Sequence, residues 1–521
     1  QVGDAAIGYA VGYDWLHPFL SEEQRTMLRH QIEAYGQWLY DESTRPDRQG
    51  HGHLFRSRLA HNHGAVVHGG LALAALALGD REEWLNHALR RCRLYLEHAI
   101  DRTGCPYEGP MYFGYGSHGV VLAAEAYDRL FGRNIVDDVP RCRRIPRAML
   151  HYVVPWGGEV VLINQTAHLM RPATSLVYTL FRYGDRAGLW GWERTMGSLG
   201  TGSHGTGGYQ GCTTAPFMVL WADPELRPQH PTEAGVPLNR FFELGQSFLR
   251  TGWEDRDVLV TFRCGEGIPG IWNHADQNSF TFFAFGEEFA AEIGPHYYTT
   301  EYHNTILMDG KGQAWQKPGN AVRGYTVTGD VREDAVYVLG DAATAYQISL
   351  GNWREGIWLG RAFRHLLFVP GPRPMLLVAD DVEHLYGKEH EWTWMMNSGN
   401  RIRPGRNTIE MIADERRARI TGVNSGAVCD VHMLWPPDAE LSTTKKSRYR
   451  LPCLEARATA VNPRFVALLI AADVGQALPQ VSVKGEAADL EITVSLEDGQ
   501  ERVLRVFPDD VRLVSAAERD E

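Results

Sequence analysis

The chain lacks the features that would mark a zinc ribbon, a membrane protein or a nucleic-acid-binding protein. Its seven cysteines are scattered and none forms a CxxC pair, which excludes a zinc ribbon and a thioredoxin-type motif. The longest apolar runs, such as 71–78, fall far short of the ~20 residues that a membrane-spanning helix needs. With 52 basic and 64 acidic residues the net charge is −12, so bulk attraction to nucleic acid or to an anionic membrane is not expected.

Length and composition indicate a folded protein of several domains. The chain has 521 residues, of which 44% are hydrophobic and 22% charged. At ~100–200 residues per domain this length predicts two to four domains. The 15 Trp, 21 Tyr and 54 Gly are weakly typical of carbohydrate-active proteins. The sequence begins with Gln1 and shows no signal peptide, so we expect a leader or an upstream segment to be missing.

The first ~230 residues have the apolar spacing of helices. A capping box begins at Ser21 and Gln24, and the segments 64–78 and 83–98 are predicted to be helices. Ser117 is expected to cap a helix over 120–131 that ends at Gly132, and 172–183 is predicted to be another helix. Helical hairpins joined by loops rich in Gly, His and Tyr favour an α/α toroid domain over residues 1–232.

From about residue 238 the pattern changes to the period of two that is typical of strands. The segments predicted as strands are 258–263, 280–283, 375–382, 408–412, 465–471 and 490–496. A hairpin turn is expected at Asp498-Gly499. We therefore predict a multi-domain α plus β protein, in which antiparallel β-sandwich structure over 238–395 and a C-terminal β-sheet region over 396–521 follow the toroid.

Two clusters of polar residues in the helical half are candidates for chemistry. Asn62 and His63 stand just before an apolar helix, where their side chains can donate hydrogen bonds to an anion or simply cap the helix. Glu108, Tyr112 and Tyr115 belong to a Gly- and Pro-containing stretch that we expect to form a tight loop. A tyrosine, with a reference pKa of ~10, can donate a proton or accept one beside a cation. Aromatic core packing is the competing interpretation.

A third cluster lies in the β half. His274, Glu292 and His303 are widely spaced, but a hairpin over 280–293 followed by a returning strand would bring them together. Two imidazoles and one carboxylate suit a zinc or manganese ion. Scattered surface residues are the alternative.

Taken together, these motifs resemble the heparinase II/III-like family, whose members include lyases acting on heparan sulfate and alginate and the related dermatan sulfate epimerase. The resemblance covers nearly the whole chain. It rests on Asn62-His63, on the stretch 108–112 (EGPMY), and on the runs 274–280 (HADQNSF) and 303–313 (HNTILMDGKGQ). It implies an α/α toroid followed by antiparallel β-sheet domains, with the toroid incomplete at the N-terminus.

The resemblance implies β-elimination at a uronic acid: the C5 proton is removed and the bond from C4 to the glycosidic oxygen breaks. Donors must neutralise the uronate carboxylate as charge develops, and Asn62 and His63 match the family positions for that task. Tyr112 matches the family tyrosine as acid, or as both acid and base, with Tyr115 as the second candidate. His274, Glu292 and His303 match the family's metal ligands, which implies one divalent ion, zinc in first place and manganese or calcium as alternatives, with a structural role.

One position departs from the family pattern. Many members have His-x-His where this chain has Trp272 and only His274 remains. His168, His204 or His118 could replace the missing base, Tyr112 could do both jobs, or catalysis could be lost. Trp272 would then serve as a platform for a sugar ring.

The leading hypothesis is a polysaccharide lyase that cleaves uronate-containing glycans. The alternatives are a C5-uronate epimerase, a non-catalytic glycan-binding homologue, and a hydrolase using paired carboxylates such as Glu108 and Asp276. Further substrate contacts are expected from Trp272, Glu108, Arg263 and His168. Arg56, Arg58, Arg171 and Arg263 could bind sulfate, but the acidic charge favours a less sulfated polymer or oligomer. From the resemblance we expect a secreted or periplasmic protein, monomeric or homodimeric.

Overall fold

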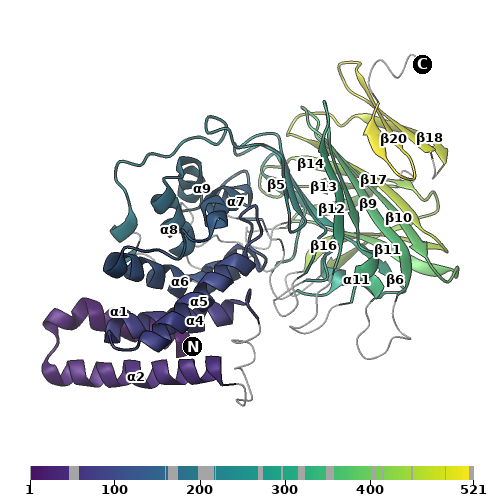
Figure 1. The fold of residues 1–521 in the computed structure, drawn as a ribbon. Helices are drawn as coiled ribbons and strands as arrows, with labels where there is room; N and C mark the ends of the chain where they lie inside the picture. The colour runs from purple at the N-terminus through teal and green to yellow at the C-terminus, as the bar shows by residue number, and fades with distance from the viewer. Residues whose placement is uncertain are drawn as a thin grey trace.

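The chain folds into a helical half followed by a half built from β-sheets (Figure 1). The computed structural model describes residues 2–45, 58–158, 160–161, 163, 174–196, 216–217, 219–267, 274–294, 297–314, 323–347, 357–399, 406–412, 416–446, 450–486 and 489–514. In Figure 1 the helices, in purple to teal, occupy one side, and the sheets, in green to yellow, occupy the other. The expected fold class, a helical toroid-type half followed by antiparallel β-sandwich structure, is confirmed.

The helical half is assembled from helices that pack against one another. These are α1 (Val2–Leu16), α2 (Glu22–Thr44), α4 (Asn62–Leu78), α5 (Glu82–Ala99), α6 (Gly109–Phe131), α7 (Ile145–His151), α8 (Thr174–Tyr183) and α9 (Arg186–Met196), with the 3-10 turns η1 (His17–Phe19) and η2 (Pro140–Arg144). No described helix is both long and apolar enough to cross a membrane.

Local signals set several of these helix boundaries. The expected capping box begins α2: the Ser21 hydroxyl accepts from the Gln24 N–H at 3.2 Å, and the Gln24 side chain accepts from the Ser21 N–H at 2.8 Å. The apolar segment predicted over 64–78 is α4, which is buried along nearly its whole length and ends at Gly79 with a positive φ of 76°.

The prediction for α6 was wrong at its start. The helix begins at Gly109, not near residue 120, so Tyr112 and Tyr115 lie on its first turns and not in a tight loop. Pro110 is compatible with this because a first-turn residue has no intrahelical partner for its N–H. Ser117 is not a cap: its hydroxyl donates to the Phe113 carbonyl at 2.6 Å inside the helix.

Four antiparallel sheets form the second half. Their strands are β1 (Arg240–Phe242), β2 (Gln246–Arg250), β3 (Leu259–Arg263), β4 (Ser279–Ala284), β5 (Glu287–Ala290), β6 (Ile306–Met308), β7 (Tyr325–Val331), β8 (Val336–Asp341), β9 (Leu359–Val369), β10 (Met375–His384), β11 (His390–Asn397), β12 (Thr408–Ile412), β13 (Arg417–Thr421), β14 (Val428–Trp435), β15 (Glu440–Lys446), β16 (Leu451–Ala460), β17 (Arg464–Ala472), β18 (Gln480–Glu486), β19 (Asp489–Ser495), β20 (Glu501–Val506) and β21 (Val511–Leu513). Two short helices, η4 (Thr300–Tyr302) and α11 (Ala343–Gln347), interrupt them. Each of the six predicted strand segments overlaps a strand, and Gly499 adopts the positive φ expected of a hairpin turn between β19 and β20.

The strand orders are β1-β2-β3-β4-β5, β12-β13-β14-β17-β10-β9-β8-β7, β15-β16-β11-β6 and β18-β19-β20-β21. Strands on both sides of residues 395/396 pair with each other, as β10 does with β17 and β11 with β16. The boundary expected there therefore does not separate two sheets.

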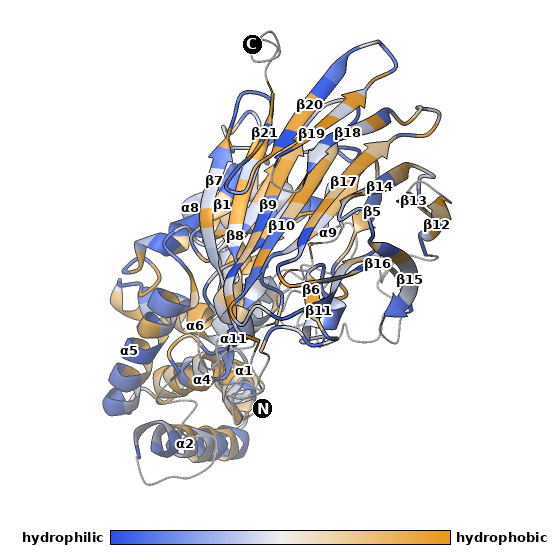
Figure 2. Cartoon of the chain, turned by 90° about the vertical axis from the view of Figure 1, so that its right-hand side faces the viewer, coloured by the Kyte–Doolittle hydropathy of each residue, from blue (hydrophilic) through white to orange (hydrophobic). Residues whose placement is uncertain are grey.

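The five-stranded sheet is buried on both faces. Leu259 and Phe283 belong to the core of the helical half, whereas Val260 and Phe282 pack in the core of the eight-stranded sheet. Alternate side chains of one strand point to opposite faces, so this small sheet joins the two halves. The hydrophobic colouring along β9, β10 and β17 in Figure 2 marks the centre of the large sheet, which packs with its second face against β18–β21.

A buried carboxylate ties the loop before α6 to the five-stranded sheet. Asp101 is 1% exposed. One of its oxygens accepts from the N–H groups of Thr103 and Cys105 at 2.8 and 2.9 Å, and the other accepts from the Leu244 N–H at 3.1 Å, in the turn between β1 and β2. The same side chain therefore shapes the loop that leads to Glu108 and fixes the position of the sheet beside it.

A buried arginine makes a second link across the seam. Arg250 on β2 is 3% exposed and donates from Nη2 to the His151 carbonyl at 2.8 Å, at the end of α7. Its guanidinium also lies 4.6 Å from the centre of the Trp253 ring. Burial lowers the pKa of Arg250 to about 9, so the cation persists at neutral pH.

Substitution of Asp101 is expected to loosen the junction of the two halves. Asp101→Ala leaves two buried N–H groups and one half-buried N–H group without their acceptor, and should lower the free energy of unfolding by roughly 3 kcal/mol, at ~1 kcal/mol for each. Asp101→Asn keeps an oxygen for Thr103 and Cys105 but turns its NH₂ towards the Leu244 N–H. Its free energy of unfolding should therefore lie between those of the wild type and Asp101→Ala. Urea denaturation measures both variants, with Asp438→Asn, at an exposed position, as control. Equal stabilities of all three variants would contradict this role.

Candidate functional site

The start of α4 places three polar side chains together. His61 is the N-cap residue, and its Nδ1 accepts from the His63 N–H at 3.1 Å. Burial, followed by the neighbouring His63 and Arg58, lowers the pKa of His61 to about 3, so this imidazole is neutral at pH 7. Asn62 is fully buried, whereas the His63 side chain is exposed. The predicted pair therefore splits into one buried amide and one imidazole open to solvent.

Glu108 holds Asn62 in place. The Asn62 N–H donates to Glu108 Oε2 at 2.9 Å, and its Nδ2 lies 3.0 Å from each carboxylate oxygen. Glu108 is 2% exposed and immediately precedes α6. The Asn62 Oδ1 atom is buried without a hydrogen-bond partner in the described part of the chain. As placed, Asn62 gives its donors to Glu108 and is left with an unused acceptor.

Glycines allow α4 and α6 to approach closely at this point. A Cβ atom at Gly116 would lie 2.8 Å from the Asn62 Cα, and one at Gly69 would lie 2.5 Å from the Gly119 backbone. Both distances are too short for a real Cβ atom, so the packing of α4 against α6 requires glycine at these two positions. The close approach of the two helices brings Asn62 beside Glu108 and Tyr112 onto the same end of the helical half.

Tyr112 lies between the helical half and the sheets. It is half-buried on the first turn of α6. Burial, followed by the Tyr298 phenol and the Glu108 carboxylate, raises the pKa of Tyr112 to about 12, and this dependence places it near both groups. Tyr115 is engaged elsewhere, because its hydroxyl donates to Asp4 on α1 at 3.1 Å. The arrangement favours Tyr112 over Tyr115 as the reactive phenol.

The β half brings His274, Glu292 and His303 together. The expected hairpin forms from β4 and β5, but the next strand, β6, pairs with β11 in a different sheet, contrary to the returning strand of the prediction. His303 nevertheless lies with its Nδ1 2.6 Å from Glu292 Oε2, and the His274 and His303 ring centres are 5.2 Å apart. Burial lowers the pKa of His303, but Glu292 more than offsets this effect and the net shift is upward.

These three residues, as placed, do not form a ligand set. One Glu292 oxygen binds His303 Nδ1, and the other accepts from the Ser279 hydroxyl. The His303 Nε2 atom is buried and has no hydrogen-bond partner among the residues that are described. Within those residues no group of three or more His, Cys, Asp or Glu is arranged to hold a metal ion. The divalent ion therefore stays a prediction.

A buried ion pair fixes the two loops that carry these histidines. The fully buried Arg364 on β9 binds both oxygens of Asp380 on β10 at 2.7 and 2.9 Å. Its Nη1 donates to the carbonyls of Asn278 and Asn304, at 2.7 and 2.5 Å. One guanidinium thus links the segment after His274 to the segment after His303.

Tyr298 is the residue that sequence reasoning missed. Its ring centre lies 5.2 Å from that of His274, and its carbonyl accepts from the Ala275 N–H at 2.8 Å. Because Tyr298 also influences Tyr112, it connects the catalytic candidates of the helical half to the histidines of the β half. No sequence motif identifies Tyr298, because nothing in the sequence distinguishes it from the other tyrosines among the 21 of the chain.

The remaining candidates are buried against other side chains or lie outside the described residues. Arg263 on β3 is 3% exposed, and its Nε donates to Asp276 at 2.9 Å, so it is not presented to a ligand. Burial lowers the pKa of His118 to about 4, and its ring packs 6.0 Å from that of Phe217. Trp272, His168, His204, Arg56 and Arg171 lie outside the described residues.

Chemically, the cluster combines one protonated phenol, one exposed imidazole and one buried carboxamide at the helical side of the junction. This set can bind an anion and supply a proton beside it. Glu108 and Asp276 do not form an acid–base pair of carboxylates, because each is buried and bound to another side chain, Asn62 and Arg263 respectively.

Comparison with solved structures shows the same fold in polysaccharide lyases. The heparan sulfate lyase HepC from Pedobacter heparinus matches with a TM-score of 0.64 and 12% identity, over 97% of this chain and 73% of that chain. A heparinase III structure matches with a TM-score of 0.65 and 12% identity, over 97% and 75% of the two chains. No protein-family model matches the chain. At this identity the likeness establishes a heparinase-like fold.

Replacing Glu108 tests whether its hydrogen bonds to Asn62 stabilise the fold. Gln at this position can accept from the Asn62 N–H and donate to the unused Asn62 Oδ1, so Glu108→Gln should change the free energy of unfolding by less than ~1 kcal/mol. Glu108→Ala leaves buried donors unsatisfied and should cost about 2–3 kcal/mol. Thermal and urea unfolding measure the two variants. A glutamine variant as unstable as the alanine variant would contradict the assigned contacts.

Proposed function

We propose that this protein is a polysaccharide lyase that cleaves uronate-containing glycans by β-elimination. The observation that carries the proposal is the placement of Tyr112, Asn62 and His63 at one end of the helical half, with Tyr112 close to Tyr298 of the β half. The heparinase-like fold supports the same chemistry. HepC is a heparan sulfate lyase by its name, and the substrate class proposed here follows from that likeness together with the residues above.

The first task in the proposed reaction is to neutralise the uronate carboxylate. The C5 proton becomes acidic enough to remove only when the charge that develops on that carboxylate is stabilised. His63 is exposed and can donate to it directly. Asn62 can reach it with Nδ2 only after its carboxamide turns away from Glu108, which would at the same time give the unused Oδ1 a new position.

The second task, protonation of the leaving C4 oxygen, is assigned to Tyr112. A phenol whose pKa is about 12 is protonated at neutral pH, so it is ready to act as an acid. The same shift makes it a poor resting base, because a phenolate would form only with a cation beside it. The C5 proton is therefore assigned to an imidazole, and the bases considered for it in the sequence are His168, His204 and His118, of which the first two lie outside the described residues. His118 does not suit this role, because it is packed against Phe217.

The substrate proposed is a uronate polymer or oligomer with little sulfate. Arg263, one of the arginines considered for sulfate, is buried on Asp276 and cannot serve. The net charge of −12 also disfavours a densely sulfated chain. A secreted or periplasmic location, where such polymers occur, remains a prediction. C5-epimerisation and glycan binding without catalysis are the outcomes that the next experiment separates from elimination.

Loss of the Tyr112 hydroxyl is expected to remove elimination. Each cleavage creates a conjugated C4=C5 uronate that absorbs ultraviolet light, so the reaction rate is measured from the rise in absorbance. The substrates tested are heparan sulfate, heparosan, chondroitin, hyaluronan and alginate. Tyr112→Phe should lower the rate by about 10²–10⁴-fold, the contribution of a positioned acid. Tyr115→Phe is the matched control and should keep most of the activity, because Tyr115 is bound to Asp4. Activity retained in Tyr112→Phe and lost in Tyr115→Phe would contradict the assignment.

The pH profile distinguishes an acid from a base at Tyr112. Because its pKa is raised to about 12, the protonated form predominates throughout pH 7–10 and is lost only above that range. If the protonated phenol is the reactive form, the Tyr112 step gives no tenfold rise per pH unit in kcat/KM between pH 7 and 10. A continuous tenfold rise per unit, abolished in Tyr112→Phe, would show instead that the phenolate reacts.

A further inference from the structure

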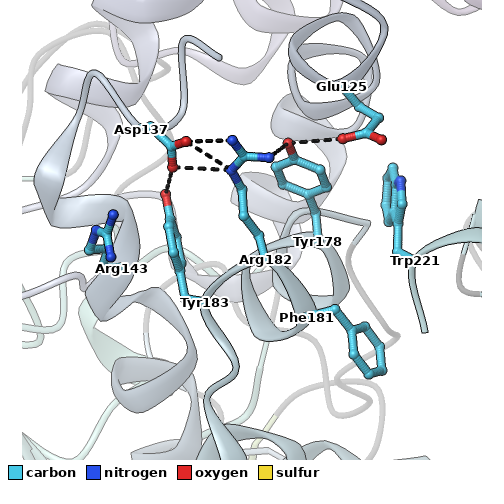
Figure 3. Close-up of a pocket in the computed structure, with 8 residues that line it drawn as sticks. All are labelled: Glu125, Asp137, Arg143, Tyr178, Phe181, Arg182, Tyr183 and Trp221. Atoms are coloured by element: carbon cyan, nitrogen blue, oxygen red, sulfur yellow. Dashed lines mark hydrogen bonds and ion pairs between the residues drawn. The ribbon is translucent and has the colours of Figure 1, made fainter. Parts of the chain in front are cut away.

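A cavity lies towards the other end of α6 from Tyr112. It has a volume of about 530 Å³, which falls in the range of small-molecule sites, and it is lined by side chains from α6, η2, α8 and the segment around Trp221 (Figure 3). Glu125 on its wall is 13 residues (112 to 125) beyond Tyr112 on the same helix, which is about 20 Å at 1.5 Å per residue. The cavity is therefore separate from the candidate active site.

The polar wall of this cavity is a preformed network. Asp137 accepts from Arg182 Nε at 3.1 Å and from the Tyr183 hydroxyl at 3.0 Å. Arg182 Nη1 donates to the Tyr178 hydroxyl at 3.2 Å, and that hydroxyl donates to Glu125 at 3.2 Å. Figure 3 shows these contacts running in one line across the cavity. This network holds two carboxylates, Asp137 and Glu125, against the single guanidinium of Arg182, so the positive charge that is left for an anion comes from Arg143.

Arg143 is the exception among the charges of the cavity. Its guanidinium lies over the Tyr183 ring at 4.7 Å. Within the described ranges it forms no close ion pair with a carboxylate, although, after the hydrogen bond from Arg182, its charge helps to lower the pKa of Asp137. Stacking on Tyr183 holds the guanidinium in place and leaves its planar N–H donors available, which is the geometry that binds a carboxylate or a sulfate in two hydrogen bonds.

Aromatic side chains complete the cavity on the side away from Arg143. The Trp221 and Tyr178 ring centres are 4.9 Å apart with planes at 70°, and Phe181 lines the same region. In Figure 3, Arg143 and Trp221 stand at opposite ends of the group. Aromatic faces pack against the C–H face of a sugar ring, while a guanidinium selects an anionic substituent.

We propose that this cavity is a secondary binding site for an acidic oligosaccharide, in which Arg143 binds the carboxylate or sulfate of a sugar and Trp221 packs against a ring. The choice of ligand rests on the proposed function. Its role is to hold a polymeric substrate about 20 Å from the site of cleavage. Long glycans would benefit from this second contact, whereas oligosaccharides too short to span the two sites would not.

Binding is tested with a hexasaccharide of alternating glucuronate and N-acetylglucosamine, by calorimetry on the full chain carrying Tyr112→Phe, so that the probe is not consumed. Adding Arg143→Gln should weaken one binding event about tenfold or more, as expected for a lost charge-assisted contact, and adding Trp221→Ala should do the same. Arg133→Gln is the matched control, since Arg133 is paired with Asp138 outside the cavity. A hexamer of N-acetylglucosamine tests the need for charge, and a 6-O-sulfated version of that hexamer shows whether sulfate replaces the carboxylate.

Unchanged binding in both cavity variants, or equal binding of the neutral hexamer, would overturn the proposal. Turnover of polymer and tetrasaccharide distinguishes this result from a failure of the lyase assignment. With Tyr112 present, Arg143→Gln should raise KM for the polymer at unchanged kcat and leave the tetrasaccharide unaffected. No absorbance change from the wild type, with cavity binding intact, would contradict the lyase assignment alone. Normal elimination with an unaltered polymer KM in Arg143→Gln would contradict the secondary site alone.

Discussion

The position of the candidate site depends on Asp101, the buried carboxylate at the seam between the two halves. Its two oxygens face different structures: one closes the loop of residues 101–105, and the other holds the turn before β2. Glu108 and Tyr112 follow this loop directly, at the start of α6. A small shift of the loop against the sheet would move Tyr112 relative to Tyr298. The seam therefore determines the distance between Tyr112 and Tyr298, the candidate groups on its two sides.

In each half, buried pairs of polar groups hold the candidate site residues in fixed positions. On the helical side, Glu108 orients Asn62 through three contacts, and Gly116 allows the backbone approach that these contacts require. On the β side, Arg364 holds the carbonyls that follow His274 and His303. Buried charges are costly unless fully paired, so such groups mark places where geometry matters more than packing alone. Tyr112 on the helical side is close enough to Tyr298 on the β side that, besides burial, the Tyr298 phenol helps to raise the Tyr112 pKa.

Sequence patterns predicted the elements better than their boundaries and contacts. The period of two from residue 238 and the apolar run of α4 follow from local geometry, and both predictions are confirmed. The start of α6 was misplaced, because Gly and Pro at 109–110 indicate a loop locally, whereas packing against α4 makes them the first turn of a helix.

Side-chain neighbours depend on the tertiary fold, which a pattern along the chain does not contain. The grouping of His274, Glu292 and His303 was predicted, but their link to Tyr112 through Tyr298 was not. The burial of Arg263 on Asp276 was also missed, since a basic residue on a strand is exposed or buried according to what packs above it. The roles assigned to Asn62, His63 and Tyr112 came from a resemblance and stay proposals.

The proposed elimination at the junction of the two halves is tested best by a crystal structure of the Tyr112→Phe variant bound to a hexasaccharide of alternating glucuronate and N-acetylglucosamine. We expect a glucuronate at the junction of the two halves, with its carboxylate within hydrogen-bond distance of His63 or Asn62 and its C4 oxygen next to the ring of residue 112. A sugar bound at the junction in the opposite orientation, or one that leaves the junction empty while occupying other surfaces, would contradict the central claim.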